Sequence, residues 1–214
     1  MENVEARKKR VKTIIKTLKK TYPDVRLALD FSTPLELLIA LILAAQCTDE
    51  RVNRVTPILF RKYRSAKDWA ETDRAVLEEE IHTTGFFRQK SASIQKCATV
   101  LLERFKGEVP RKLDDLLSLP GVGRKTANIL RGNAFGDPAI GVDTHVGRLA
   151  QRIGLSKQRD PDKIETDLSD VVPRADQVEF CSRIQQHGRE ICTARSPQCN
   201  KCVIDKLCPK VGVQ

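Results

Sequence analysis

Aromatic residues are scarce in this 214-residue chain, which has seven Phe, two Tyr and one Trp. Proteins that bind single-stranded nucleic acid stack its bases on aromatic side chains, so the composition argues against that mode of binding. Long apolar runs are lacking too, since no stretch reaches the roughly 18 to 20 uninterrupted apolar residues of a membrane span. The N-terminal segment is charged and amphipathic, unlike an apolar leader. We therefore expect a cytoplasmic protein with no membrane partner.

The sequence also lacks the signals of β-strands. β-Branched residues do not alternate cleanly with polar ones, and no Asn-Gly or Asp-Gly turn lies between apolar runs. Apolar residues recur instead at helical spacing, which predicts an all-α protein. The clearest of these stripes are Val11, Ile14, Ile15 and Leu18; Ile94, Cys97, Ala98, Leu101 and Phe105; and Val146, Leu149, Ala150 and Ile153.

One predicted helix has the features of a fully buried element. Thr33 can cap its start, Pro34 suits its first position, and Glu36 can reach back toward the cap. The residues from Leu35 to Ala45 are apolar on all sides. Such a helix is expected at the centre of a helical bundle.

Basic residues outnumber acidic ones, with 38 Lys and Arg against 28 Asp and Glu, and the formal net charge is +10. A positive surface potential attracts polyanions, and nucleic acid is the first candidate. Because aromatic residues are few, contact with the phosphates of a duplex fits better than stacking on unpaired bases. Charge alone leaves an equal alternative, in which the surface is charged only for solubility.

Four of the seven cysteines lie near the C-terminus at the spacing C-x6-C-x2-C-x5-C, namely Cys192, Cys199, Cys202 and Cys208. So short a segment cannot bury a core of its own, and bound metal would supply the ordering energy. The uneven spacing favours a [4Fe-4S] cluster, while a zinc site and a disulfide pair stay open as alternatives. The odd number of cysteines argues against a disulfide framework. We predict that the other three are core residues: Cys47, Cys97 and Cys181.

Residues 113–131 have the pattern of a helix-hairpin-helix. A short apolar helix is followed by Leu-Pro-Gly-Val-Gly at 119–123 and by a second helix from about Arg124. The proline ends the first helix, and Gly121 and Gly123 permit a tight turn with close backbone approach. The N–H groups and the dipole at the start of the second helix can hold a phosphate. We predict that Gly121, Gly123 and Arg124 bind one DNA strand; the alternative is an inert connection between helices.

Two ionisable side chains are candidates for chemistry. Lys125 lies in the first turn of the second helix, where the helix dipole and Arg124 are expected to lower the pKa of the lysine. More free amine is then available to attack an electrophilic carbon and form a Schiff base, although a lysine that only contacts phosphate is equally compatible. Asp143 directly precedes a helical stripe and is predicted to be its N-cap, which keeps the carboxylate ionised.

Three segments together resemble the endonuclease III family of DNA glycosylases: Leu119-Pro-Gly-Val-Gly-Arg-Lys-Thr-Ala127, Val142-Asp-Thr-His145 and the four-cysteine spacing. The resemblance spans nearly the whole chain, with the motifs in the same order and at the same separations. It implies a bifunctional DNA glycosylase and apurinic/apyrimidinic lyase that removes oxidised pyrimidines in base excision repair. By this resemblance Lys125 is the nucleophile that attacks C1′, and Asp143 activates the lysine or stabilises the developing sugar cation.

The resemblance also implies how the DNA is held. Gln46 would enter the space that the flipped nucleotide leaves, and Phe86 would be a wedge where the family prototype has leucine. From the residues alone, Phe86 would more often be a core residue. The implied architecture is a six-helix barrel at residues 29–137 and an iron-sulfur domain at residues 1–28 and 138–214, with a DNA cleft between them. We expect a monomer that binds double-stranded DNA containing a damaged base or an abasic site.

Other enzymes of this kind and a non-catalytic module are the alternatives for the same residues. A relative that removes mismatched adenine would lack the lysine and have a longer C-terminal extension, and a mismatch thymine or uracil glycosylase would have another residue at position 125. A non-catalytic helix-hairpin-helix module with a structural metal would bind DNA without cutting it. The presence of both Lys125 and Asp143 argues against the non-catalytic module.

Overall fold

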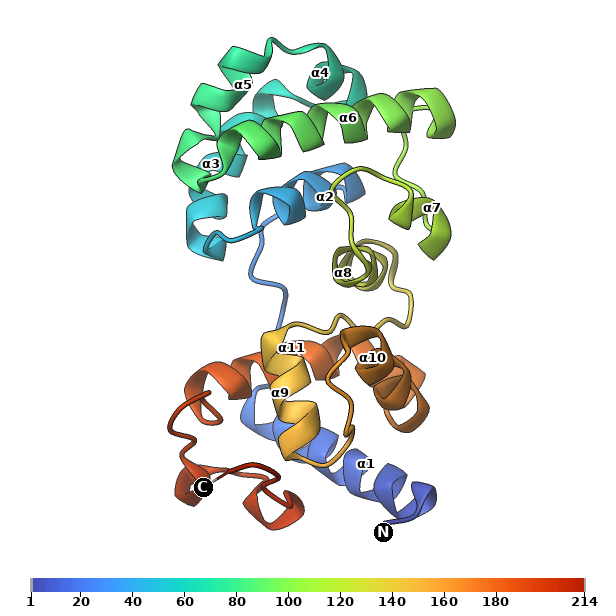
Figure 1. The fold of residues 1–214 in the computed structure, drawn as a ribbon, viewed down its shortest axis with the longest axis vertical. Coiled ribbons are helices and arrows are strands. Elements are labelled where there is room, and N and C mark those ends of the chain that lie inside the picture. Colours follow the sequence, from blue (N-terminus) through green and yellow to red (C-terminus); the bar gives the residue numbers. More distant parts are fainter. Residues whose placement is uncertain (1, 214) are drawn as a thin grey trace. The chain divides into compact units, whose positions relative to one another are not determined.

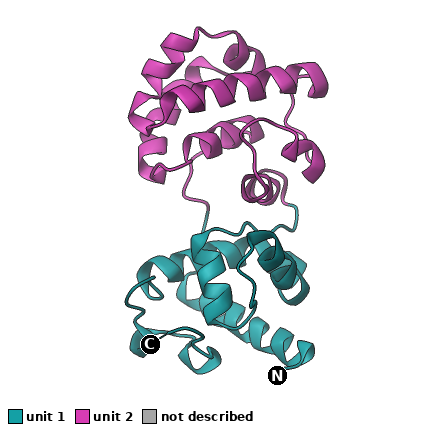
Figure 2. Cartoon of the chain, in the orientation of Figure 1, with its two compact units in different colours: residues 1–26, 137–214 teal, residues 27–136 magenta. Residues whose placement is uncertain are grey.

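The structure, a computed structural model, describes residues 2–213. The chain forms two compact units (Figure 2), called unit 1 (residues 1–26 and 137–214) and unit 2 (residues 27–136). Every regular element of the described residues is helical (Figure 1), which confirms the all-α prediction. None of the described helices combines the length and apolar character needed to traverse a bilayer.

Unit 2 is built around helix α2. Its elements are α2 (Pro34–Leu43), α3 (Asp49–Lys62), α4 (Ala66–Glu71), α5 (Arg74–Glu80), the short 3-10 helix η1 (His82–Thr84), α6 (Phe87–Phe105), α7 (Leu113–Leu117) and α8 (Arg124–Phe135). Helix α6 packs against α4 and α5, and α2 packs against α3, α6 and α8. Helix α2 therefore lies in the interior of unit 2 (Figure 1).

The prediction of a buried helix is confirmed by α2. Its residues 37–40 have no exposed surface. Thr33 caps the helix, because its Oγ1 accepts a hydrogen bond from the Glu36 amide at 3.2 Å. The Glu36 carboxylate reaches back one residue further than expected and accepts from the Ser32 amide. Two backbone N–H groups at the start of the helix, those of Glu36 and Ser32, are thus satisfied locally, much as in a capping box.

Helix α6 contributes a second set of buried residues to the core of unit 2. Ile94, Cys97, Ala98 and Leu101 are at most 1% exposed, so this stripe is confirmed. Burial raises the pKa of the Cys97 thiol to about 12, which makes it an unreactive core residue. Cys47 also packs against this core but is only partly buried.

Unit 1 combines the N-terminal helix with the C-terminal third of the chain. Its elements are α1 (Val4–Thr21), α9 (Thr144–Arg152), α10 (Pro161–Val171), η2 (Arg174–Asp176), α11 (Gln177–Glu190), η3 (Cys199–Lys201) and η4 (Asp205–Leu207). Helix α1 packs against α10 and α11, and α9 packs against the same two helices. The apolar stripes predicted for the segments of α1 and α9 are buried in this core. Cys181 on α11 is buried as predicted, and burial raises the pKa of its thiol to about 12.

Candidate active site and metal centre

The helix-hairpin-helix is present in unit 2 as α7, a turn and α8. Gly121 has φ +82°, and a Cβ at this position would lie 3.2 Å from the Cβ of Ser93 on α6. Glycine is needed there for its conformation and for its size. Gly123 has φ −91° and ψ 173°, which any residue can adopt, and a Cβ there would meet nothing within 4 Å. The expectation that the turn depends on both glycines is therefore wrong for Gly123.

Gly123 matters instead as the N-cap of α8. It has no side chain to accept the first N–H groups of the helix, so these groups can face a ligand. The first turn contains no acidic residue, and it contains Arg124 and Lys125. The Lys125 side chain is exposed, and that of Arg124 is partly buried. The positive end of the helix dipole and these two cations together form a site suited to an anion such as phosphate.

Asp143 is the N-cap of α9 in unit 1, as predicted. Its Oδ1 accepts a hydrogen bond from the Val146 amide at 2.7 Å, and its Oδ2 lies 3.3 Å from Nδ1 of His145. The Asp143 side chain is only 13% exposed, which limits its rotation. The partner of His145 does not follow from the sequence, because a histidine two residues after an N-cap has no fixed direction. The two contacts hold the carboxylate in one orientation.

Gln46 and Phe86 share an unusual backbone conformation in unit 2. Their φ angles are +52° and +48°, in the left-handed region that residues other than glycine rarely adopt. Gln46 follows α2 and is exposed, and Phe86 precedes α6 and is 58% exposed. The expectation from the residues alone that Phe86 belongs to the core is therefore wrong. Strained, exposed positions of this kind are typical of functional sites.

The four cysteines of the C-terminal motif line one cavity in unit 1, together with Arg152 and His187. No group of three or more His, Cys, Asp or Glu side chains in the described residues is arranged to hold a single metal ion. A zinc site requires four sulfurs at about 2.3 Å from one point, whereas a [4Fe-4S] cluster distributes its four thiolates over a larger body. The four thiolates on this cavity could hold a [4Fe-4S] cluster.

Hydrogen-bond donors surround these sulfurs. Arg152 Nη1 donates to Cys192 Sγ at 3.3 Å, and the Lys210 amide donates to Cys208 Sγ at 3.4 Å. His187 Nε2 lies 3.3 Å from Cys202 Sγ. Donors directed at sulfur stabilise the thiolate form that a metal needs.

The ring of His187 is fixed from its other side by Tyr22. The hydroxyl of Tyr22 lies 3.1 Å from His187 Nδ1. Burial lowers the pKa of His187, so the neutral ring is favoured. If Tyr22 donates to Nδ1, the single N–H of the neutral ring is on Nε2 and points at Cys202. His187 therefore links Tyr22 to the cysteine segment.

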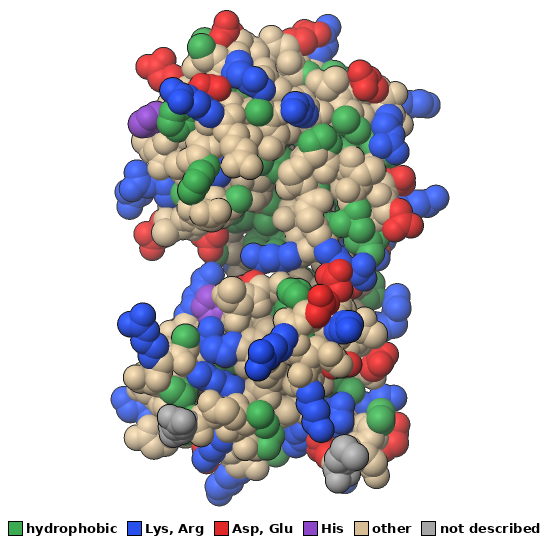
Figure 3. Space-filling view, in the orientation of Figure 1, with side chains coloured by type: hydrophobic (Ala, Val, Ile, Leu, Met, Phe, Trp, Pro, Cys, Tyr) green, Lys and Arg blue, Asp and Glu red, His purple; other side chains and the backbone are tan. Residues whose placement is uncertain are grey.

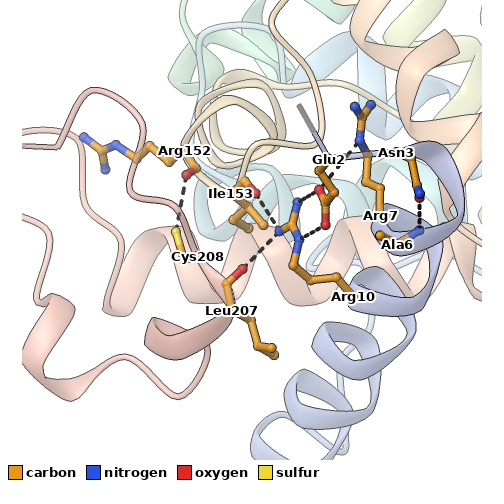
Figure 4. A network of polar contacts seen from close by, with 9 residues as sticks. All are labelled: Glu2, Asn3, Ala6, Arg7, Arg10, Arg152, Ile153, Leu207 and Cys208. Carbon is orange, nitrogen blue, oxygen red and sulfur yellow. Dashed lines mark hydrogen bonds and ion pairs between the residues drawn. The ribbon is translucent and has the colours of Figure 1, made fainter.

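Arg10 joins the N-terminal helix to the cysteine segment (Figure 4). Its Nη1 donates to the carbonyls of Ile153, at 2.8 Å, and Leu207, at 3.0 Å. Glu2 pairs with the same guanidinium at 2.7 Å and helps to raise its pKa. Arg10 therefore connects α1, the C-cap of α9 and η4, which directly precedes Cys208.

The comparisons with known proteins first define a class. Residues 39–174 match the model of the HhH-GPD superfamily base excision DNA repair proteins. The chain resembles the solved structure of a thermostable thymine-DNA glycosylase, with a TM-score of 0.86 and 26% identity over 94% of this chain and 96% of that chain. It also resembles the structure of a trapped endonuclease III–DNA covalent intermediate, with a TM-score of 0.89 and 40% identity over 98% and 97%.

The particular family follows from the curated relatives. Endonuclease III of Synechocystis sp. is 49% identical over 98% of this chain and 96% of its own length. Endonuclease III of Escherichia coli (strain K12) is 38% identical over 91% and 92%. The chain belongs to the endonuclease III family of the HhH-GPD superfamily. It is accordingly a base excision repair enzyme, a DNA glycosylase with apurinic/apyrimidinic lyase activity.

Proposed function

We propose that this enzyme removes oxidised pyrimidines from duplex DNA and then cleaves the abasic strand, with Lys125 as its nucleophile. The observation that carries the proposal is the position of Lys125, exposed in the first turn of a hairpin helix whose N-cap is glycine. A phosphate bound by that helix start would bring the neighbouring sugar to the amine. A lysine outside the hairpin would have no such means of positioning.

The reaction begins when the amine of Lys125 attacks C1′ of the target nucleotide and the damaged base leaves with the bonding electrons. The secondary amine then loses a proton as the sugar ring opens, which gives an imine between Lys125 and C1′. The imine withdraws electrons and acidifies the proton on C2′. Loss of that proton and departure of the 3′ phosphate complete the β-elimination, and water releases the sugar fragment from the lysine.

Asp143 is the proposed partner of the lysine. Its carboxylate either accepts a proton from the attacking amine or stabilises the positive charge that develops on the sugar. Both roles require an ionised carboxylate in a fixed orientation. The hydrogen bonds to the Val146 amide and the contact with His145 support such an orientation.

We propose that one DNA strand is bound by Gly121, Gly123 and Arg124. The space that the flipped nucleotide leaves in the duplex would be filled by Gln46 and Phe86. Extrusion of a nucleotide costs a few kcal/mol, which inserted side chains partly offset. Lys and Arg side chains are distributed over the visible faces of both units (Figure 3), as sequence-independent binding to phosphates requires. All these residues belong to one chain, and we propose that the enzyme acts as a monomer.

Cys192, Cys199, Cys202 and Cys208 are the proposed ligands of a [4Fe-4S] cluster. The cavity that they line and the N–H groups directed at the sulfurs of Cys192 and Cys208 support this assignment. In the proposal the cluster supplies folding energy to a segment with little core of its own. The proposed reaction at the sugar uses Lys125 and Asp143 and takes no step at the cluster.

Borohydride reduction in the presence of a duplex with one abasic site tests the nucleophile. Reduction of the imine links protein and DNA covalently, so the adduct migrates as a single band. We expect the adduct with the unaltered enzyme and none with Lys125→Gln. Lys112→Gln, which alters an exposed lysine just before α7, is the matched control and should still be trapped. Trapping of K125Q at the control rate would reject the assignment.

A further inference from the structure

Lys90 is a buried lysine that the proposed chemistry does not use. It lies on α6, and only 4% of it is exposed. Its Nζ donates hydrogen bonds to the carbonyls of Leu43, at 2.7 Å, and Thr84, at 2.8 Å. Both contacts are buried, and together they link Leu43 and Thr84, which are distant from each other in the sequence.

Each of these carbonyls belongs to the last residue of a helix. Leu43 ends α2, and Thr84 ends η1. Carbonyls at helix ends lack partners within their own helix, and the negative end of the helix dipole favours a cation there. A single ammonium therefore satisfies the ends of two helices at once.

These two helix ends lead directly to Gln46 and Phe86. Gln46 is three residues after Leu43, and Phe86 is two residues after Thr84, and both have left-handed backbone conformations. The Lys90 amide also donates to the Phe86 carbonyl at 3.0 Å. The side chain of Lys90 thus binds the residues that precede the loops of Gln46 and Phe86, and its main-chain amide binds Phe86 itself.

A buried lysine at this position is not explained by its contribution to the stability of the fold. Within the described residues, Lys90 makes no ion pair with a carboxylate, and its side-chain partners are two neutral carbonyls. Burial lowers the pKa of the lysine, an effect that Cys47 partly opposes. Apolar residues that replace a buried charged group often make a protein no less stable, so the clearest gain from such a group is a specific geometry.

We propose that Lys90 is a positioning residue that fixes the loops of Gln46 and Phe86 relative to each other, so that both side chains enter the duplex together. The inference rests on the proposed function, in which these two residues fill the vacated stack. Without the ammonium, the two helix ends lose their shared donor and the loops move independently. The loss affects extrusion of the nucleotide and leaves the reaction at Lys125 intact.

The test compares a duplex containing one abasic site with the same abasic strand alone, under single-turnover borohydride trapping of the holoenzyme. Insertion is needed only where the target is stacked in a duplex. We expect Lys90→Met to slow trapping on the duplex roughly 10- to 100-fold, and on the single strand by less than about 2-fold. Lys96→Met, an exposed position of the same helix, is the matched control and should match the unaltered enzyme on both substrates.

Fluorescence of 2-aminopurine placed opposite the abasic site adds a readout of insertion itself. The rise on binding should be smaller with K90M than with K96M. Lys90→Gln keeps a donor that can reach one carbonyl, and we expect an intermediate loss; this variant decides the question if K90M does not fold. Equal losses on both substrates, or a duplex rate like that of K96M, would overturn the inference. Failure of the unaltered enzyme to be trapped at all would reject the proposed function instead.

Discussion

Helix α2 in unit 2 and residues 192–208 in unit 1 differ in almost every property that orders a chain. In α2, six of the ten residues are buried, and the helix contacts other helices on several sides. In residues 192–208, Ile204 alone is buried, and the regular structure consists of two short 3-10 turns. The hydrogen bonds of Arg10 and Arg152 contribute to this segment from outside it.

The difference shows two sources of order in one protein. Burial of apolar side chains is sufficient for α2, because each buried leucine or isoleucine contributes about 1.5–3 kcal/mol. Residues 192–208 bury too little apolar surface to offset the entropy of ordering, which is about 1–2 kcal/mol per residue for the backbone. In the proposed function a bound cluster supplies the rest, and the variants below test this contrast.

Loss of a cysteine ligand is expected to have the largest effect. Cys202→Ser removes one thiolate of the proposed cluster, so the purified protein should lose its iron. Residues 192–208 should lose protection from amide hydrogen exchange, whereas α2 should keep it. Cys97→Ser is the matched control: it should retain iron and destabilise unit 2 by about 1–3 kcal/mol, because it buries a hydroxyl. Iron analysis measures the loss of the cluster, and hydrogen exchange measures the loss of order in each segment. A full iron content in C202S would contradict the proposal that metal orders residues 192–208.

Truncation in the core of α2 should have the next largest effect. Leu38 has no exposed surface, and Leu38→Ala is expected to lower the free energy of unfolding of unit 2 by about 2–5 kcal/mol. Iron content should not change. Leu117→Ala, at a leucine that is 37% exposed, should change the same quantity by less than about 0.5 kcal/mol. Similar effects of the two variants in denaturant titrations would show that packing around α2 is not the source of its order.

Substitutions of the two hairpin glycines are expected to change the free energy of unfolding in opposite directions. Gly121→Ala forces alanine to φ +82° and towards Ser93, so the free energy of unfolding should fall by about 1–3 kcal/mol. Gly123→Ser adds an N-cap hydroxyl and should raise it by up to about 1 kcal/mol. The same hydroxyl competes with phosphate for the helix start, so DNA affinity should fall. Greater stability together with unchanged affinity would argue against phosphate binding there.

The smallest effect on stability is expected at Asp143. Asn caps a helix about as well as Asp, so Asp143→Asn should leave the unfolding transition within about 0.5 kcal/mol. The charge is lost, and base release under single-turnover conditions should fall by about 100-fold or more with DNA binding retained. Asp143→Ala removes both the cap and the charge, so it should also lower the free energy of unfolding by about 0.5–2 kcal/mol. If D143N lost DNA binding and base release equally, Asp143 would have only the role of a helix cap.

Much of the fold could be predicted because its causes are local in sequence. The stripe of α6 and the cap at Thr33 follow from spacing and residue type, and both are confirmed. The N-cap position of Asp143 is also confirmed, since a short polar side chain before an apolar stripe has few other roles.

The missed features depend on contacts between distant segments or on backbone angles. Arg10 meets carbonyls more than 140 residues further along the chain, and Lys90 joins two helix ends that no spacing rule connects. Residue type alone predicts neither the exposure of Phe86 nor its positive φ. Sequence patterns predicted the helices that carry Lys125 and Asp143, while the conformation of the chain at Gln46 and Phe86 required the structure.

The most direct test of the central claim is to locate the covalent bond. The reduced adduct with an abasic duplex can be digested with protease and nuclease, and the modified peptide sequenced by mass spectrometry. Lys125 as nucleophile predicts the sugar remnant on the Nζ of residue 125. A remnant on another lysine or on the N-terminal amine would contradict the account.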